Sequence, residues 1–75
     1  MDKFTLYHTE GCHLCEQALA LLNAQLNSEQ IILRDIVEEL ELVEKYQYTI
    51  PVVANKNNQE LGWPFDEQKL KEFIN

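Results

Sequence analysis

The chain contains two cysteines, Cys12 and Cys15, which stand one helical turn apart in the run Gly11-Cys12-His13-Leu14-Cys15. A disulfide in so small a loop stabilises a fold by about 2 kcal/mol, against about 3 kcal/mol for a fifteen-residue loop, and ring strain reduces the gain further. The pair is therefore a poor structural cross-link. Its spacing is better suited to reversible thiol–disulfide exchange, in which one thiolate attacks a disulfide and a neighbouring thiol completes the reaction.

The segments around the cysteines predict a strand before them and a helix after them. Residues 3–8 alternate in polarity and are rich in β-formers, which is typical of a short strand. Residues 9–11 predict a loop in which Gly11 permits a sharp turn. From about Cys12, apolar residues recur at helical spacing up to Asn27-Ser28. A strand–helix junction favours redox chemistry over the alternative, two inert thiols buried on an amphipathic helix.

The rest of the chain predicts a βαβ unit with further elements after it. Residues 30–35 form a mostly apolar run of strand length, which we expect to be buried on both faces and parallel to the first strand. Residues 38–46 are acidic but place Leu42, Val43 and Tyr46 on one face of a short amphipathic helix. The remaining predicted elements are a third strand at 50–54, a turn at 55–58, a fourth strand at 59–61 and a final helix at 67–74 that Asp66 caps.

Length and charge limit the classes of protein that the chain can belong to. Seventy-five residues are enough for one domain, 1–75, and the 45% of hydrophobic residues is ordinary for a folded protein. A net charge of −7 opposes binding to nucleic acid or to anionic membranes, and no segment resembles a signal peptide or a membrane span. We expect a monomeric cytoplasmic protein, and in that compartment a C-x-x-C pair is more often redox-active or metal-binding than structural.

The order of elements and several short motifs resemble one family. With C-x-x-C after the first strand and Ile50-Pro51 opening the third, the chain resembles the glutaredoxin branch of the thioredoxin fold over essentially its whole length. This resemblance implies an α/β thioredoxin-like fold of order β-α-β-α-β-β-α, with a four-stranded mixed sheet flanked by helices, and a redox dithiol. The motifs most similar to those of small bacterial glutaredoxin-like proteins are Gly11-Cys12-His13-Leu14-Cys15, Glu44-Lys45-Tyr46, Ile50-Pro51-Val52 and Trp63-Pro64-Phe65-Asp66.

The resemblance also implies roles for individual residues. Cys12 would be the solvent-facing nucleophile and Cys15 the resolving thiol. Free N–H groups and the macrodipole at the start of a helix would stabilise a thiolate at Cys12, whereas an unperturbed cysteine is only slightly ionised near neutral pH. Pro51 would be a cis proline, and Ile50 would offer backbone groups to an incoming disulfide. The implied substrate-binding residues are Ile50, Pro51, Gly11, His13, Leu14 and Trp63.

Departures from the glutaredoxin pattern concern glutathione binding. His13-Leu14 stands between the cysteines instead of Pro-Tyr, no basic residue immediately precedes Cys12, and Gly62-Trp63 replaces paired glycines. Together with Glu10 and the net negative charge, these differences argue against a direct glutathione site. We expect no bound cofactor and no metal. Glutathione or another thiol would act only as electron donor, and the substrate would be a disulfide-containing protein or a small disulfide.

Several polar and aromatic residues have two interpretations each. His13 either tunes the reactivity of Cys12 or is an exposed bystander, and His8 either relays a proton or is an ordinary strand-end histidine. Trp63-Pro64-Phe65 either lines a hydrophobic groove for a protein partner or packs the last helix against the sheet. Asp66 is a helix cap, and by analogy it would also contact the amino group of a ligand.

A thiol–disulfide oxidoreductase with Cys12 and Cys15 as its catalytic residues is the leading hypothesis. The first alternative is a module in which Cys12 and Cys15 bind zinc, or an iron–sulfur cluster shared across a dimer with added thiols. The sequence is short of ligands for it, because a closed zinc site needs four and only His8 is suitably placed beyond the cysteines. The second alternative is a redox-silent adaptor that uses the thioredoxin fold for recognition alone.

Overall fold

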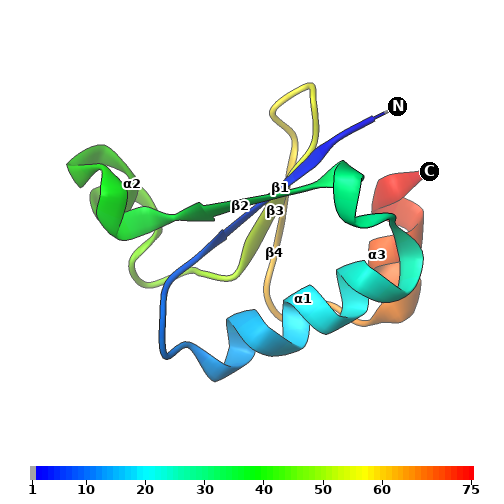
Figure 1. Cartoon of the computed structure of the whole chain (residues 1–75), viewed down its shortest axis with the longest axis horizontal. Coiled ribbons are helices and arrows are strands. Elements are labelled where there is room, and N and C mark those ends of the chain that lie inside the picture. The colour runs from blue at the N-terminus through cyan, green and yellow to red at the C-terminus, as the bar shows by residue number, and fades with distance from the viewer. Residues whose placement is uncertain (1) are drawn as a thin grey trace.

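A computed structural model describes residues 2–75, which contain a mixed four-stranded sheet (Figure 1). The strands β1 (Phe4–His8), β2 (Ile31–Asp35), β3 (Val52–Ala54) and β4 (Glu60–Gly62) are arranged in the order β2-β1-β3-β4. β1 and β2 are parallel, whereas β3 is antiparallel to both β1 and β4. The predicted four-stranded mixed sheet is therefore confirmed.

Three α-helices accompany the sheet in the described part of the chain. α1 (His13–Gln25) connects β1 to β2, α2 (Leu40–Tyr46) connects β2 to β3, and α3 (Glu67–Ile74) follows β4. The 3₁₀ turns η1 (Ser28–Gln30) and η2 (Ile36–Glu38) flank β2. α1 packs against α3, and α2 lies at the other end of the molecule from α3 (Figure 1). The predicted order β-α-β-α-β-β-α is confirmed, with the 3₁₀ turns as additions.

Successive side chains along the strands point to opposite faces of the sheet, which divides the core into two parts. Leu6 on β1 pairs with Leu33 on β2 and with Val53 on β3, so the three side chains share the face that α1 and α3 cover. Tyr7 points to the opposite face, where it stacks on Tyr46 of α2 with ring centroids 4.4 Å apart. The larger buried cluster consists of Phe4, Leu6, Ala18, Leu22, Leu26, Val53, Phe65 and Leu70, and the smaller one, beside α2, consists of Ile36, Tyr46 and Val52.

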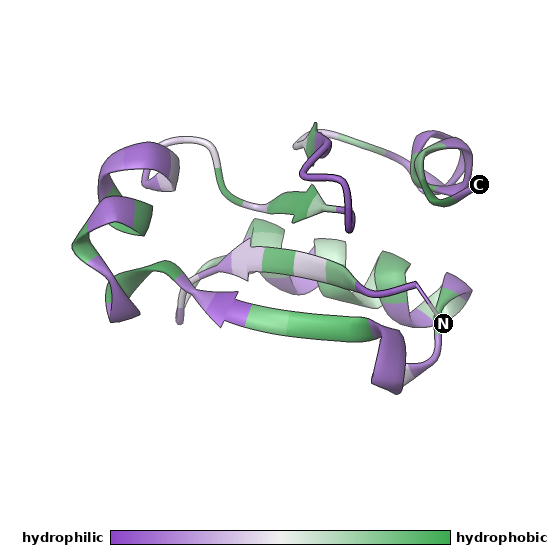
Figure 2. Cartoon of the chain, turned by 90° about the horizontal axis from the view of Figure 1, so that it is seen from above, coloured by the Kyte–Doolittle hydropathy of each residue, from purple (hydrophilic) through white to green (hydrophobic). Residues whose placement is uncertain are grey.

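The prediction that residues 30–35 are buried on both faces is wrong. β2 is an edge strand that pairs with β1 alone among the described residues, and Ile32 and Leu33 remain 42% and 51% exposed. Figure 2 shows this hydrophobic strand running along an outer edge of the sheet. The apolar run was enough to predict a strand. Burial on both faces also requires neighbours, and the short helix α2 packs on the central strands instead.

Element ends differ from the prediction by a few residues. β3 begins at Val52 rather than Ile50, because Pro51 has no N–H group to donate to a strand ladder. The second helix begins at Leu40 rather than Glu38, since η2 takes the preceding residues.

The helix cap predicted at Asp66 is confirmed. Its Oδ1 accepts a hydrogen bond of 2.8 Å from the backbone N–H of Lys69, inside the first turn of α3. The predicted turn at 55–58 is also present, and there Asn58 adopts a positive φ of 62°, which asparagine tolerates.

Candidate functional site

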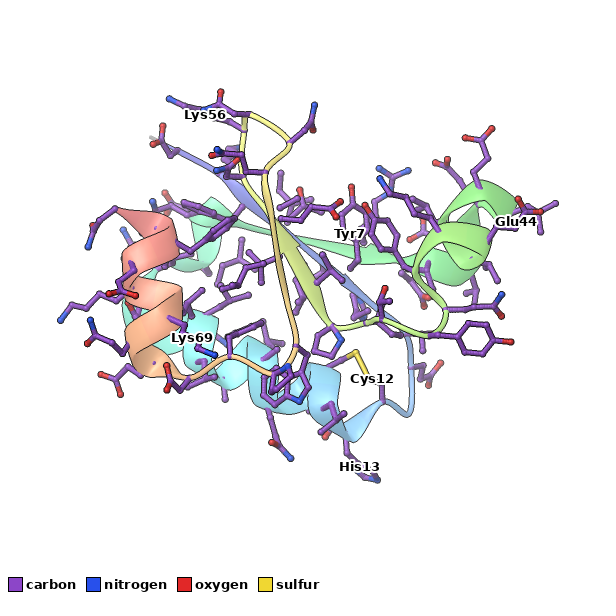
Figure 3. All side chains as sticks on the ribbon, turned by 180° about the vertical axis from the view of Figure 1, so that it is seen from behind. Tyr7, Cys12, His13, Glu44, Lys56 and Lys69 are labelled. Atoms are coloured by element: carbon purple, nitrogen blue, oxygen red, sulfur yellow. A yellow bond between two sulfur atoms is a disulfide. The ribbon has the colours of Figure 1, made fainter. Side chains whose placement is uncertain are left out.

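Both cysteines lie where β1 leads into α1 (Figure 3). Cys12 is the N-cap residue of α1, and its Sγ accepts a hydrogen bond of 3.2 Å from the backbone N–H of Cys15. The two side chains form a disulfide, and their Cα atoms are 5.2 Å apart. Cys12 is partly exposed, whereas Cys15 is only 4% exposed. One sulfur therefore faces solvent while its partner is shielded beneath it.

The start of α1 favours negative charge on Cys12 once the disulfide is reduced. N–H groups in the first turn of a helix have no partner within the helix, and the one on Cys15 already points at the Cys12 sulfur. The aligned peptide dipoles add a partial positive charge at the same end. Both effects stabilise a thiolate at Cys12, so this arrangement suits Cys12 to nucleophilic attack and Cys15 to the resolving step.

The turn between β1 and α1 depends on Gly11. Its φ of +80° lies in the left-handed region that residues with a Cβ atom rarely adopt. A Cβ atom here would meet nothing within 4 Å, so backbone conformation rather than crowding accounts for the glycine. Gly11 thus directs the chain from the strand into the helix that Cys12 caps.

Ile50 and Pro51 lie at the same end of the sheet as the disulfide. Val52 pairs with Tyr7 in the antiparallel β1–β3 ladder, so the residues before Val52 lie beyond Tyr7, toward the turn into α1. The Ile50–Pro51 peptide bond is cis, as the resemblance predicted, and the Pro51 side chain is fully buried. Trp63 lies at the same end, directly after β4, and its backbone N–H donates a hydrogen bond of 3.2 Å to the Pro51 carbonyl oxygen.

Tyr46 holds the loop before β3, a role that sequence reasoning missed. Its carbonyl oxygen accepts hydrogen bonds from the N–H groups of Thr49 and Ile50, at 2.9 and 3.0 Å. Its ring stacks on Tyr7, and its hydroxyl donates a hydrogen bond to Glu60. Burial, followed by the bond to Glu60, raises the pKa of the Tyr46 hydroxyl. Because the Ile50 N–H is already bonded, the carbonyl oxygen is the backbone group that Ile50 has left for a substrate.

His13 and Leu14 lie on the surface of the first turn of α1. The His13 side chain is 90% exposed, and its Nδ1 lies 3.9 Å from Oε2 of Glu16 (Figure 3). Leu14 is 44% exposed. Both positions are open to a molecule that approaches Cys12 from solvent, and a role for His13 in tuning Cys12 stays a prediction.

The aromatic segment after β4 divides between core and surface. Phe65 is 4% exposed within the larger core cluster, as the packing interpretation predicts. Trp63 packs on Phe65 edge to face, with ring centroids 5.0 Å apart, and stays partly exposed. The segment therefore anchors the approach to α3 while leaving part of Trp63 on the surface near the disulfide end.

A hollow of about 240 Å³ adjoins the disulfide on the side of β2. Cys12, Cys15 and His8 line it together with apolar side chains from β1, α1 and β2. Sequence reasoning missed this hollow because it depends on the exposure of β2. His8, partly buried at the end of β1, is thereby placed beside the cysteines.

No three His, Cys, Asp or Glu side chains among residues 2–75 are grouped in a way that could hold a metal ion. None of the described helices is long and apolar enough to cross a membrane.

This fold, with a C-x-x-C pair at the start of α1, defines a redox-type module of the thioredoxin fold. The model of the family described as Glutaredoxin-like domain (DUF836) matches residues 3–75, and the chain belongs to this family. The resemblance drawn from the motifs is thereby confirmed. No curated protein matches the sequence.

Solved structures from two organisms share the fold. The X-ray structure of Northeast Structural Genomics target protein XcR50 from X. campestris is 34% identical, with a TM-score of 0.85, and the match covers 95% of this chain and 93% of that one. The solution structure of the same target is 33% identical, with a TM-score of 0.82 and coverage of 96% and 91%. Protein Ne2328 from Nitrosomonas europaea is 26% identical, with a TM-score of 0.76 and coverage of 96% and 89%.

Proposed function

We propose that the protein is a thiol–disulfide oxidoreductase that uses the Cys12–Cys15 dithiol on a protein disulfide or a small disulfide. The observation that carries the proposal is the placement of the two sulfurs. Cys12 is partly exposed at the N-cap of α1, and Cys15 is buried within bonding distance of it. Membership of the glutaredoxin-like family supports the same class of activity.

The reaction begins with the reduced protein. The Cys12 thiolate attacks one sulfur of the substrate disulfide, the substrate S–S bond breaks, and one half leaves as a thiolate while the other stays bonded to Cys12. Cys15 then loses its proton to solvent and attacks the Cys12 sulfur, which releases the second half as a thiolate. Two electrons pass from the dithiol to the substrate, and the protein is left with the Cys12–Cys15 disulfide.

A thiol donor such as glutathione would complete the cycle. Two donor thiols give two electrons to the Cys12–Cys15 disulfide and are themselves joined as a disulfide, without a resident cofactor. The Ile50 carbonyl oxygen and the exposed part of Trp63 would face the substrate on the β3 side of Cys12, whereas Pro51 is buried and would act only by positioning Ile50. We extend the proposal to action as a monomer in the reducing cytoplasm, where the dithiol would be kept reduced.

Replacing Cys15 with serine tests the order of the two steps. Reduced Cys15→Ser protein should accumulate a covalent adduct with bis(2-hydroxyethyl) disulfide, because no thiol is left to resolve it. Cys12→Ser protein should form no adduct, since the remaining sulfur is shielded. Intact-mass spectrometry reads both results. An adduct on Cys12→Ser protein, or none on Cys15→Ser protein, would contradict the proposal.

A further inference from the structure

An apolar groove runs from the disulfide along α1 and β2. We propose that it binds an extended segment of a protein substrate that carries a lysine or arginine beside its disulfide cysteine. This inference rests on the proposed function and names the class of substrate for the same dithiol. The groove lies over β1 and β2, whereas Ile50 and Pro51 lead into β3 on the other side of β1 and do not line it.

Two adjoining hollows make up the groove. The first, of about 240 Å³, is lined by both cysteines. The second, of about 180 Å³, shares Leu19 and Leu33 with the first and continues to Ile31. Because the hollows share Leu19 and Leu33, they adjoin each other between α1 and β2. An extended peptide reaches both hollows, whereas a compact disulfide fills only the one beside the cysteines.

The floor of the groove is apolar surface that no other described part of the chain covers. Leu33 faces the α1 side of the sheet, because it pairs with the buried Leu6, yet it remains 51% exposed. β2 is also an edge strand, so its outer backbone groups have no strand partner among residues 2–75. Exposed apolar surface beside a reactive group is typical of a binding site.

Charge decides which kind of segment the groove accepts. Glu10 and Glu16 line the first hollow, and no lysine or arginine lines either hollow. Nδ1 of His13 lies 3.9 Å from Oε2 of Glu16, and His8 lines the first hollow together with both carboxylates; each histidine opposes a cationic substrate only when it is protonated. A lysine or arginine side chain meets both features, since its aliphatic stem covers apolar surface while its charged end reaches a carboxylate. An acidic segment would be repelled from the same place.

Blocked peptides of the form acetyl-X-Cys-X-amide, joined as disulfide dimers, test the inference. The reduced protein should reduce the peptide with X = Lys about tenfold faster than that with X = Gln, and X = Glu should be the slowest. Each rate is divided by the rate with dithiothreitol, which corrects for the intrinsic reactivity of the disulfide. Added salt should shrink the differences. If the protein reduces none of the three peptides, the proposed function is contradicted. If it reduces all three at equal corrected rates, the groove assignment alone is overturned.

Two double variants separate the groove from the overall charge of the protein. Glu10→Gln with Glu16→Gln should remove most of the preference for lysine, about threefold for each carboxylate. Glu67→Gln with Glu72→Gln makes the same change in net charge on α3, which contacts the far end of α1 through a 2.9 Å hydrogen bond from Gln25 to the Glu67 carbonyl. Equal losses in the two double variants would show that net charge is responsible and would overturn the inference.

A pair of β2 variants tests the groove without altering a carboxylate. Leu33→Lys places a cation on the groove face, and Ile32→Lys places one on the opposite face of the same strand. Both positions are exposed, so both variants should fold, which circular dichroism checks. The lysine peptide should lose its advantage with Leu33→Lys and keep it with Ile32→Lys. The same effect at both positions would overturn the proposal.

Discussion

Replacing Tyr46 with phenylalanine removes one hydroxyl and leaves the rest of its packing intact. The ring still stacks on Tyr7, and the backbone carbonyl still accepts from Thr49 and Ile50. The hydrogen bond to Glu60 is lost. The variant therefore isolates the contribution of one side-chain bond that joins α2 to β4.

The expected loss of stability follows from the type of bond. A hydrogen bond to a charged group contributes about 1.5–3 kcal/mol. Tyr46 is buried but Glu60 lies at the surface and also has Lys45 at 3.6 Å, so we expect the lower end of that range. The free energy of unfolding should fall by about 1.5 kcal/mol, which lowers the midpoint of thermal unfolding by about 6–12 °C in a domain of this size.

The loss should depend on pH in one direction. Burial and the bond to Glu60 raise the pKa of Tyr46 above its ordinary value of 10.0. A tyrosine whose pKa is higher in the folded state contributes stability that is fully present below its unfolded pKa and is lost as pH rises through the folded pKa. The difference between wild type and variant should therefore be constant from neutral pH to about pH 9 and shrink above about pH 10.

Urea unfolding at several pH values measures this difference, and Tyr48→Phe is the matched control. Tyr48 is 91% exposed, so the same deletion of a hydroxyl should change stability by less than about 0.5 kcal/mol. Equal stability of wild type and Tyr46→Phe at neutral pH would refute the reasoning. So would a loss of the same size in Tyr48→Phe, or a difference that grows above pH 10.

Substitutions at Gly11, Asp66 and Leu22, the first two with a control variant each, test the elements that place the site. Gly11→Ala should lower the free energy of unfolding by about 1–2 kcal/mol, because alanine must adopt the left-handed conformation there. Gly62→Ala should leave it nearly unchanged, because the φ of Gly62 is not positive and a Cβ atom there would meet open space. Urea unfolding compares the two variants. Asp66→Ala should lower the free energy of unfolding by about 1 kcal/mol, because the α3 cap is lost. Asp66→Asn should be nearly as stable as wild type in the same assay, because asparagine also caps helices. An asparagine variant as unstable as the alanine variant would contradict the capping role. Leu22→Ala should lower the free energy of unfolding by about 3 kcal/mol, because Leu22 is fully buried. A midpoint of thermal unfolding within a few degrees of wild type would be inconsistent with that packing.

The features that the sequence predicted correctly depend on residues close together along the chain. Cys12 precedes a helical periodicity, Gly11 precedes Cys12, and Asp66 precedes the last apolar stripe, so each signal lies within one turn of the element that it starts. These local patterns were sufficient for the order of elements and for the position of the dithiol at the start of α1.

The features that were missed depend on contacts across the fold. Burial of β2 on both faces was predicted from its composition, but strand order places it at an edge and leaves Leu33 half exposed. The sequence predicted Tyr46 only as one apolar residue on a helix face, because its partners Tyr7 and Glu60 lie on β1 and β4, far from it along the chain. The hollow beside the cysteines is formed by three elements together, so no single segment of the sequence could have signalled it.

The reactivity of the two thiols in the reduced protein tests the proposed redox chemistry most directly. Fully reduced protein is treated with a small amount of iodoacetamide near neutral pH, and peptide mass spectrometry assigns the alkylated cysteine, with the same chain in concentrated urea as reference. We predict that Cys12 is alkylated well before Cys15 in the folded protein, and faster than Cys12 in urea, because it is the exposed sulfur and the start of α1 stabilises its thiolate. Alkylation of Cys15 first, or a Cys12 that reacts no faster folded than unfolded, would contradict the proposal.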